Sequence, residues 1–286
     1  MQSKTSMKLI GILTAVVLLL CLWAVQFIPV TAQSGSSTDT DSGQELPPEE
    51  RQALLDQMEM AHAAAEAPAT VNDACTIGSW QTVSPVNTTR SRPALTYAPF
   101  NGRFYMLGGE NPVHNRHIPI EEYNPVADAW SDKTYLLTDV TNTGAAAIGQ
   151  YIYLPGGYTS SGAVATMQRY NIVANTLTYL TPLPTPLSAH AVVALDNKVY
   201  ALGGNVTGSV VATNHIYDVG SNSWQTGATL PVPVEYAAAV TDGYYIFVIG
   251  GDTTNEATVQ RYNPHTDKWT LIPDLAVGAR RSRRLF

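Results

Sequence analysis

The sequence predicts an all-β protein made of about four copies of one structural unit, and two repeating patterns carry that prediction. A Gly-Gly pair recurs four times, at steps of 48, 47 and 47 residues, and each pair closes a short apolar run. An aromatic residue followed seven positions later by Trp recurs in phase with the glycines. Internal repetition with a period of about 50 residues is typical of propellers and solenoids. The glycine pairs are Gly108-Gly109, Gly156-Gly157, Gly203-Gly204 and Gly250-Gly251.

The aromatic pattern has one departure and one extra copy. Three tyrosines lead to a Trp, whereas Tyr170 leads to Leu177. Trp80 lies 28 residues before the first glycine pair, close to the spacing of 26 in the later copies. Trp80 therefore resembles the last strand of a preceding unit. The three complete pairs are Tyr123 with Trp130, Tyr217 with Trp224, and Tyr262 with Trp269.

Each unit is predicted to hold four strands, called a to d from first to last. In the third unit we expect strand a at 191–194, strand b at 199–202, strand c through 215–217, and strand d at Trp224. These runs are rich in Val, Ile, Tyr and Ala and are bounded by Gly, Asn and Asp, as strands usually are. The glycine pair permits positive φ or close backbone approach. The Tyr and Trp side chains supply apolar area between neighbouring units.

An apolar strand ending in Gly-Gly, followed by Tyr-Asn-Pro and then Trp, resembles the kelch repeat. The clearest copies are 123–130 and 262–269, and the resemblance covers about residues 76 to 275. Kelch repeats imply a β-propeller in which each repeat supplies one four-stranded blade. We therefore expect a kelch-type propeller of about four blades at 75–275, in the family that also includes galactose-oxidase-like propellers.

The ends of the repeat array predict an incomplete ring. The strand d at Trp80 precedes the first complete set, and the chain runs past Trp269 into the start of a further unit. It then ends in an arginine-rich segment, 276–286, interpreted as a basic tail. We expect four complete blades and a leftover edge, with a closed four-bladed ring as the alternative. An open edge exposes unpaired backbone groups and would favour self-association.

The N-terminal segment predicts export. Lys4 and Lys8 precede an uncharged apolar run at 9–28, which is long enough to span a bilayer as a helix. The positive flank places the N-terminus in the cytoplasm and the blades outside it. Residues 1–32 are either such a signal anchor or a signal peptide cleaved after Ala32. The expected location is extracytoplasmic, with the protein either anchored by one helix or secreted.

Composition limits the remaining possibilities. Residues 33–74 form a low-complexity stalk with a possible short helix at 48–67. The net charge of −7 disfavours nucleic-acid binding. With Cys21 in the apolar run, Cys75 stands alone in the exported part, which rules out an internal disulfide and a cysteine-built zinc site there.

Sequence motifs for catalysis are largely absent. The chain has no Gly-x-Ser-x-Gly, no His-Glu-x-x-His and no phosphate-binding glycine loop. His114 and His117 are the one close histidine pair, and no third ligand is evident, so we expect neither a metal nor another cofactor. The resemblance keeps a carbohydrate-active enzyme open, either oxidase-like or like sialic-acid mutarotases. For the second kind, Arg92, His190 and Glu235 are the candidate pocket residues. A truncated fragment without independent function is a third hypothesis.

The loop pattern favours binding through one face. Strand direction alternates within a blade, so the b–c and d–a loops share one face and the a–b and c–d turns share the other. The a–b turns are uniform, whereas the b–c loops vary in length and polarity. Variable polar loops on a rigid scaffold are typical of binding proteins, although solvated connectors would vary too. We expect a non-enzymatic propeller that binds a protein or a glycan, with Arg92 and Glu235 as best anchors. The candidate residues are Arg92, His114, Tyr158, His190, Asn205, Glu235 and Asp252.

A topology experiment tests the predicted export. A reporter that is active only in the cytoplasm, fused after Ala279, should be silent, because the blades are expected beyond the membrane. Activity from that fusion would show that the blades stay inside.

Overall fold

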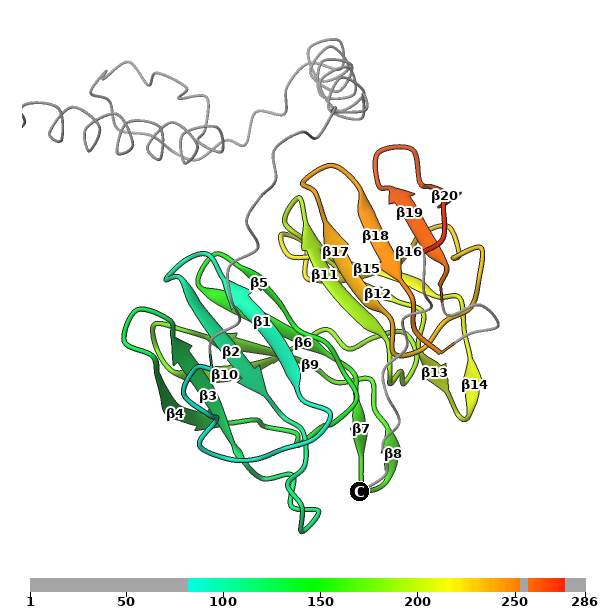
Figure 1. Cartoon of the computed structure of the whole chain (residues 1–286). Coiled ribbons are helices and arrows are strands. Elements are labelled where there is room, and N and C mark those ends of the chain that lie inside the picture. The colour runs from blue at the N-terminus through cyan, green and yellow to red at the C-terminus, as the bar shows by residue number, and fades with distance from the viewer. Residues whose placement is uncertain (1–81, 253–256, 276–286) are drawn as a thin grey trace, which may run out of the picture. The chain divides into compact units, whose positions relative to one another are not determined.

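The computed structural model describes residues 82–252 and 257–275, and these residues form β-strands and connecting turns without any helix (Figure 1). The expected N-terminal segment at 1–32, the stalk at 33–74, Cys75, Trp80 and the tail at 276–286 lie outside the described residues. Within the described residues, no helix is long and apolar enough to cross a membrane.

The strands form four antiparallel four-stranded sheets, one for each predicted repeat. Each sheet is a meander in which strand a is innermost and strand d outermost. Blade 1 contains β1 (Ala94–Ala98), β2 (Arg103–Leu107), β3 (Pro119–Asn124) and β4 (Ala129–Tyr135). Blade 2 contains β5 (Ala146–Ile148), β6 (Tyr151–Pro155), β9 (Met167–Asn171) and β10 (Thr176–Leu180).

Blades 3 and 4 repeat the same order, and two b–c loops carry hairpins of their own. Blade 3 contains β11 (Ala191–Leu195), β12 (Lys198–Leu202), β15 (Asn214–Asp218) and β16 (Ser223–Thr226). Blade 4 contains β17 (Ala238–Thr241), β18 (Ile246–Ile249), β19 (Val259–Asn263) and β20 (Lys268–Ile272). The hairpins are β7 (Tyr158–Thr159) with β8 (Gly162–Ala163), and β13 (Asn205–Val206) with β14 (Ser209–Val210).

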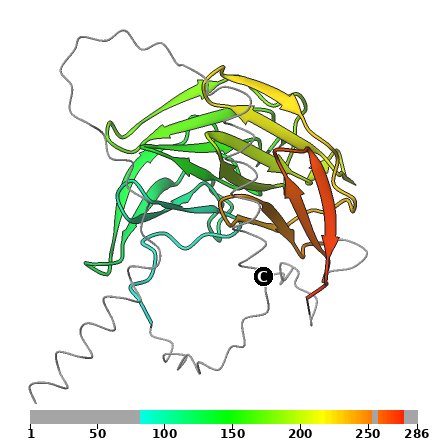
Figure 2. The same cartoon turned by 90° about the horizontal axis from the view of Figure 1, so that it is seen from above.

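The four blades follow one another in an arc around a common axis (Figure 2). The innermost strands are in contact in sequence order, β1 with β5, β5 with β11, and β11 with β17. The all-β architecture and the four-stranded blades predicted from the repeat are therefore confirmed.

The Gly-Gly pairs exist because the next blade touches the backbone at that point. A Cβ on Gly203 would lie 2.3 Å from the carbonyl oxygen of Val234, which precedes strand a of blade 4. The neighbouring Gly204 donates its N–H to the same oxygen at 2.7 Å. Both glycines have positive φ. Blade 1 repeats the arrangement, with Gly108 and Gly109 against the carbonyl oxygen of Val140. Both properties expected of the pair, positive φ and close approach, are present.

Pairs of buried tyrosines join the blades. A strand-b Tyr meets the strand-c Tyr of the next blade with ring centroids 6.0 to 6.1 Å apart at all three interfaces. Burial raises the pKa of Tyr170 to about 12, so its hydroxyl stays neutral. The pairs are Tyr105 with Tyr170, Tyr153 with Tyr217, and Tyr200 with Tyr262. This regularity explains why the aromatic pattern repeats in phase with the glycines.

The tryptophans of strand d are only partly buried and act as much by hydrogen bonding as by packing. The indole Nε1 of Trp224 donates to the carbonyl of Thr181 in the segment that leaves blade 2, at 2.8 Å. Trp269 does the same to Ala228, which lies just after blade 3. Each indole also packs on the Tyr seven residues before it. The predicted apolar role of Trp between blades therefore combines with a polar one.

The residues after strand d dock onto the next blade in a fixed way. The N–H of Thr181 donates to the side chain of Asn222 in the c–d turn of blade 3, and Ala228 donates to Asp267 in blade 4. Ser84 makes the same bond to Asp128 of blade 1 at 2.8 Å. Ser84 also follows Trp80 by four residues, as Ala228 follows Trp224. Ser84 thus occupies the position that follows a strand d.

The two end blades keep apolar side chains in solvent. Three hydrophobic clusters join blades 1 to 2, 2 to 3 and 3 to 4, and within the described residues no such cluster joins blade 4 to blade 1. Leu95 and Tyr97 on β1 are 57% and 48% exposed, and Val240 on β17 is 48% exposed. At the filled interfaces, the corresponding side chains pack against a neighbouring blade.

Two glycine substitutions distinguish the stability cost of an interblade overlap from the cost of a left-handed backbone conformation. Gly203 and Gly208 both have positive φ, but a Cβ on Gly208 would meet no atom within 4 Å. We expect Gly208→Ala to cost about 1–2 kcal/mol for the left-handed backbone alone. Gly203→Ala should cost about 3–5 kcal/mol, because the overlap with Val234 adds to that strain.

Urea denaturation of the two purified variants measures this difference. Equal midpoints would contradict the role given to the interblade carbonyl contact.

Candidate functional site

Backbone bridges bring the d–a and b–c loops together on one face of the propeller. In each blade, one residue before strand a pairs in antiparallel fashion with one residue just after the Gly-Gly pair. The pairing places loops that are 17 to 19 residues apart in sequence at the same rim, as strand alternation predicts. The bridged pairs are Ser91 with Glu110, Thr141 with Tyr158, Ser188 with Asn205, and Glu235 with Asp252.

One residue with a left-handed backbone conformation follows each bridge, at the inner end of the d–a segment, and the four residues together form a collar. It consists of Arg92, Asn142, Ala189 and Tyr236, whose φ angles lie between 52° and 57°. The N–H of each residue from Asn142 onward donates to the carbonyl of the preceding member, at 2.7 to 3.2 Å. Non-glycine residues in this conformation are strained and persist only where surrounding structure imposes it. Because the four side chains differ in kind, no sequence pattern predicted this collar.

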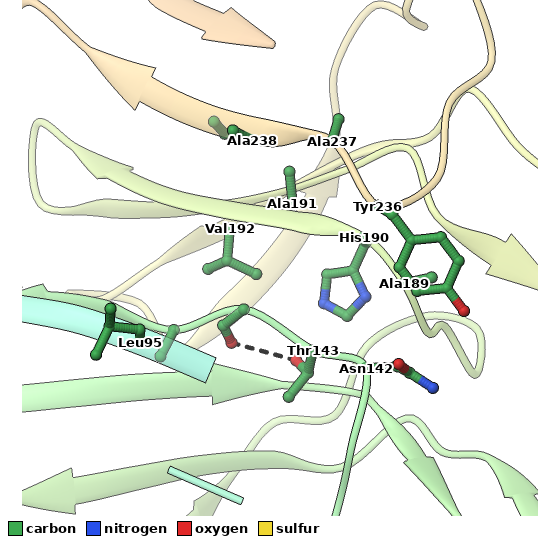
Figure 3. Close-up of a pocket in the computed structure, with 13 residues that line it drawn as sticks. Leu95, Asn142, Thr143, Ala189, His190, Ala191, Val192, Tyr236, Ala237 and Ala238 are labelled. Atoms are coloured by element: carbon green, nitrogen blue, oxygen red, sulfur yellow. Dashed lines mark hydrogen bonds between the residues drawn. The ribbon is translucent and has the colours of Figure 1, made fainter. Parts of the chain in front are cut away.

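A cavity of about 320 Å³ lies inside the arc beneath the collar (Figure 3). Its walls come mainly from the starts of β11 and β17 and from the residues just before β5, β11 and β17, and most of the lining residues are Ala or Gly. The polar side chains that line it are Asn142, Thr143, His190 and Tyr236. The small lining residues leave the cavity open, and the four polar side chains determine which ligands it could bind.

His190 is the most unusual polar group of the cavity. It is only 4% exposed, and neither ring nitrogen forms a well-aligned hydrogen bond, although the Pro155 carbonyl makes a weak contact with the ring. Burial lowers the pKa of His190 to about 4, the Pro155 carbonyl opposes this shift, and His215 adds slightly to it. The imidazole is therefore neutral at pH 7, with one N–H donor and one acceptor nitrogen. The side-chain oxygen of Asn142, in a residue 7% exposed, is likewise unpaired.

Arg92 belongs to a charged cluster on blade 1. Its guanidinium forms an ion pair with Glu110, and Arg116 approaches the other carboxylate oxygen at 2.9 Å. The Glu110 side chain is 5% exposed, whereas the Arg92 side chain is 40% exposed. His114 lies 3.7 Å from the same carboxylate and is almost fully exposed. Two arginines thus surround one buried carboxylate.

Glu235 lies on the opposite side of the face and is buried. Its carboxylate accepts a hydrogen bond from the Asn205 side-chain amide at 2.9 Å, and its backbone pairs with Asp252. Arg92 and Glu235 were expected to be matching anchors aimed at the central channel. They instead occupy different repeat positions, since Arg92 corresponds to Tyr236, and neither lines the cavity. Of the three candidate pocket residues, the structure places only His190 there.

Exposed apolar side chains occur on successive b–c loops. Val113 is 80% exposed, Tyr158 at the start of β7 is 42% exposed, and Val210 at the end of β14 is 39% exposed. The opposite face also has exposed apolar tips, at Val126 and Val173 in the c–d turns. Apolarity alone does not distinguish the faces, but long loops and charged side chains occur together on the b–c side.

The histidine pair of the first b–c loop does not form a joint site. His114 approaches Glu110, whereas Nδ1 of His117 lies 3.2 Å from Asp139 and its ring stacks on Tyr135. Within the described part of the chain, no three His, Cys, Asp or Glu residues are grouped so as to hold a metal ion.

A buried ion pair in blade 1 was not predicted from the sequence. The Arg90 and Glu121 side chains are 1% and 0% exposed and pair directly. Glu121 also accepts the N–H groups of Asn87 and Thr88, and Arg90 donates to three carbonyls. Gln168 and Gln260 sit at the same repeat position and bond to the corresponding d–a backbone. The pair therefore fixes a d–a segment and is not accessible to a ligand.

The buried imidazole makes stability depend on pH. Because the folded-state pKa of His190 lies below its unfolded value near 6.5, its neutral form is favoured by folding. Stability should be full above pH 6.5 and fall as the pH drops from there toward 4, by at most about 3 kcal/mol. His190→Leu should lose this part of the pH dependence, whereas the exposed control His265→Gln should keep it. Urea unfolding at pH 7 and pH 4.5 measures the effect, and identical pH dependence in both variants would contradict it.

Comparison with known proteins agrees with this architecture. The family model described as the KLHDC2/KLHL20/DRC7 Kelch-repeats domain matches residues 96–284. No individual curated protein gives a match. The family match covers more than half of the chain and coincides with the four blades and their Gly-Gly contacts. The chain therefore belongs to the Kelch-repeat family.

Proposed function

We propose that this chain is a binding propeller that holds a protein partner on the face formed by its b–c and d–a loops. Membership of the Kelch-repeat family supports protein binding as the general role. The observation that carries the choice of face is the set of four backbone bridges, which fix two kinds of loop side by side in every blade. Loops held on a rigid scaffold in this way are suited to recognition.

Loop length supports this face over the opposite one. The b–c loops of blades 2 and 3 are long enough to form the β7–β8 and β13–β14 hairpins, whereas the a–b turns are short. Val113, Tyr158 and Val210 place exposed apolar surface on three successive b–c loops. Aromatic and apolar side chains among polar neighbours are typical of protein interfaces, and Tyr is common among residues that dominate binding energy.

Charged side chains gather on the blade 1 side of the face. Arg92 and Arg116 both contact the Glu110 carboxylate there, and the Arg92 side chain is 40% exposed. We infer that a partner segment would present an acidic residue toward Arg92. Such complementarity affects association rate and orientation more than affinity. Because Arg92 is already paired with Glu110, its contribution to binding is expected to be modest.

The proposed setting is outside the cytoplasm. Lys4 and Lys8 before the apolar run at 9–28 support it, with the segment either retained as an anchor or cleaved after Ala32. The partner would then be an exposed protein. A second copy of this chain, docked on the apolar flank with Leu95 and Tyr97, is an additional possible partner. The proposed role requires no cofactor.

Selection from a phage-displayed peptide library tests the proposed face. Clones selected on the full chain should bind Tyr158→Glu at least about tenfold more weakly, because a buried charge replaces an apolar contact. The matched controls are Val126→Glu and Val173→Glu, which add the same charge to exposed tips of the opposite face.

Biolayer interferometry with the selected peptides gives the affinities. Binding that is lost in the two valine variants and kept in Tyr158→Glu would place the binding site on the opposite face, which carries the a–b and c–d turns.

A further inference from the structure

Two buried polar side chains line the central cavity with unmet hydrogen-bonding capacity. The Pro155 carbonyl makes at most a weak contact with the His190 ring, whose nitrogens form no well-aligned hydrogen bond, and the side-chain oxygen of Asn142 is unpaired. Both residues are more than nine-tenths buried, and both line the same cavity (Figure 3). Buried polar groups in folded proteins nearly always have partners, so two groups with unmet hydrogen-bonding capacity along one cavity call for an explanation.

The lining specifies an uncharged ligand. The neutral imidazole offers one donor and one acceptor, and Asn142 offers an acceptor oxygen. The hydroxyl of Thr143 already donates to the Pro155 carbonyl at 2.6 Å, so its oxygen is available only as an acceptor. No Asp, Glu, Lys or Arg is among the described lining residues. A hydroxyl group fits this set, because it both donates and accepts without carrying charge.

We propose that the cavity binds an uncharged polyhydroxyl molecule of monosaccharide size, held by His190 and Asn142. The volume of about 320 Å³ falls in the range of small-molecule sites and far exceeds the roughly 30 Å³ that one water occupies. The half-buried Tyr236 ring at the collar supplies an apolar surface on which the C–H face of a sugar ring can pack.

The proposed sugar contacts and the proposed protein contacts are different residues. The sugar contacts are His190 and the collar residues Asn142 and Tyr236, at the inner ends of the d–a segments, whereas Val113, Tyr158 and Val210 belong to the b–c loops. Because no carboxylate is among the described lining residues, the proposal is binding without conversion of the sugar. A change at His190 should leave peptide binding intact, and Tyr158→Glu should leave sugar binding intact. Failure of one proposal is therefore distinguishable from failure of the other.

Titration of the full chain with single sugars tests the proposal. The probes are glucose, galactose, mannose and N-acetylglucosamine, with glucosamine and N-acetylneuraminic acid as charged comparators, in a detergent that has no sugar head group. We expect saturable binding of at least one neutral sugar by calorimetry. The same sugar should shift the His190 ring resonances in the spectrum of histidine-labelled protein.

His215 provides a matched control for His190. It is 6% exposed, both of its ring nitrogens are unpaired, and it does not line the cavity. His190→Leu should weaken sugar binding at least about tenfold, whereas His215→Leu should keep it within about twofold. Asn142→Gly, which suits the positive φ at that position, should also weaken binding about tenfold and covers the case in which His190→Leu does not fold.

Three outcomes would overturn the proposal. The first is no saturable heat or resonance shift with any neutral sugar, which would mean that the cavity holds only water. The second is equal weakening in His190→Leu and His215→Leu, which would trace the loss to the fold. The third is binding of the charged sugars alone.

Discussion

The contact between a Gly-Gly pair and the carbonyl of the following blade is the interaction on which the rest of the structure depends. The first glycine leaves room for that carbonyl, as Gly203 does for Val234, and the second donates a hydrogen bond to it. This contact sets where each d–a segment enters its blade. The bridge to the b–c loop, the left-handed collar residue and the start of strand a all follow within a few residues.

The collar and the cavity both result from the d–a segment that recurs in every blade. Each d–a segment turns inward through one left-handed residue, and the collar hydrogen bonds join these residues from blade to blade. Below the collar, the beginnings of the inner strands carry Ala and Gly, so the center of the arc stays open. His190 and Asn142 therefore reach a space that the fold itself creates, while loop length remains free to vary above it.

The sequence was sufficient to predict the fold, because its evidence is local and repeated. Gly-Gly and Tyr recur in phase and make the same contacts at each of the three interfaces between the described blades. The candidate site was predictable only in part. It is built from the four d–a segments, and the equivalent positions of these segments carry different residue types, so the sequence does not show which residues correspond. Arg92 and Glu235 look equivalent in the sequence, yet the bridges place them one position apart. Asn142, Tyr236 and the Arg90–Glu121 pair follow no repeating pattern, so only the structure revealed them.

The same backbone contact joins neighboring blades at each of the three interfaces. This repetition affects how the number of blades can change during evolution. Because Gly109, Gly157 and Gly204 all bond to a main-chain carbonyl, this contact between neighboring blades does not depend on the side chain of the acceptor residue. Stability in such arrays is approximately a sum of unit and nearest-neighbor terms. Duplication or loss of a whole repeat would therefore preserve every remaining interface. The number of blades can then drift between relatives while the architecture of each blade stays constant.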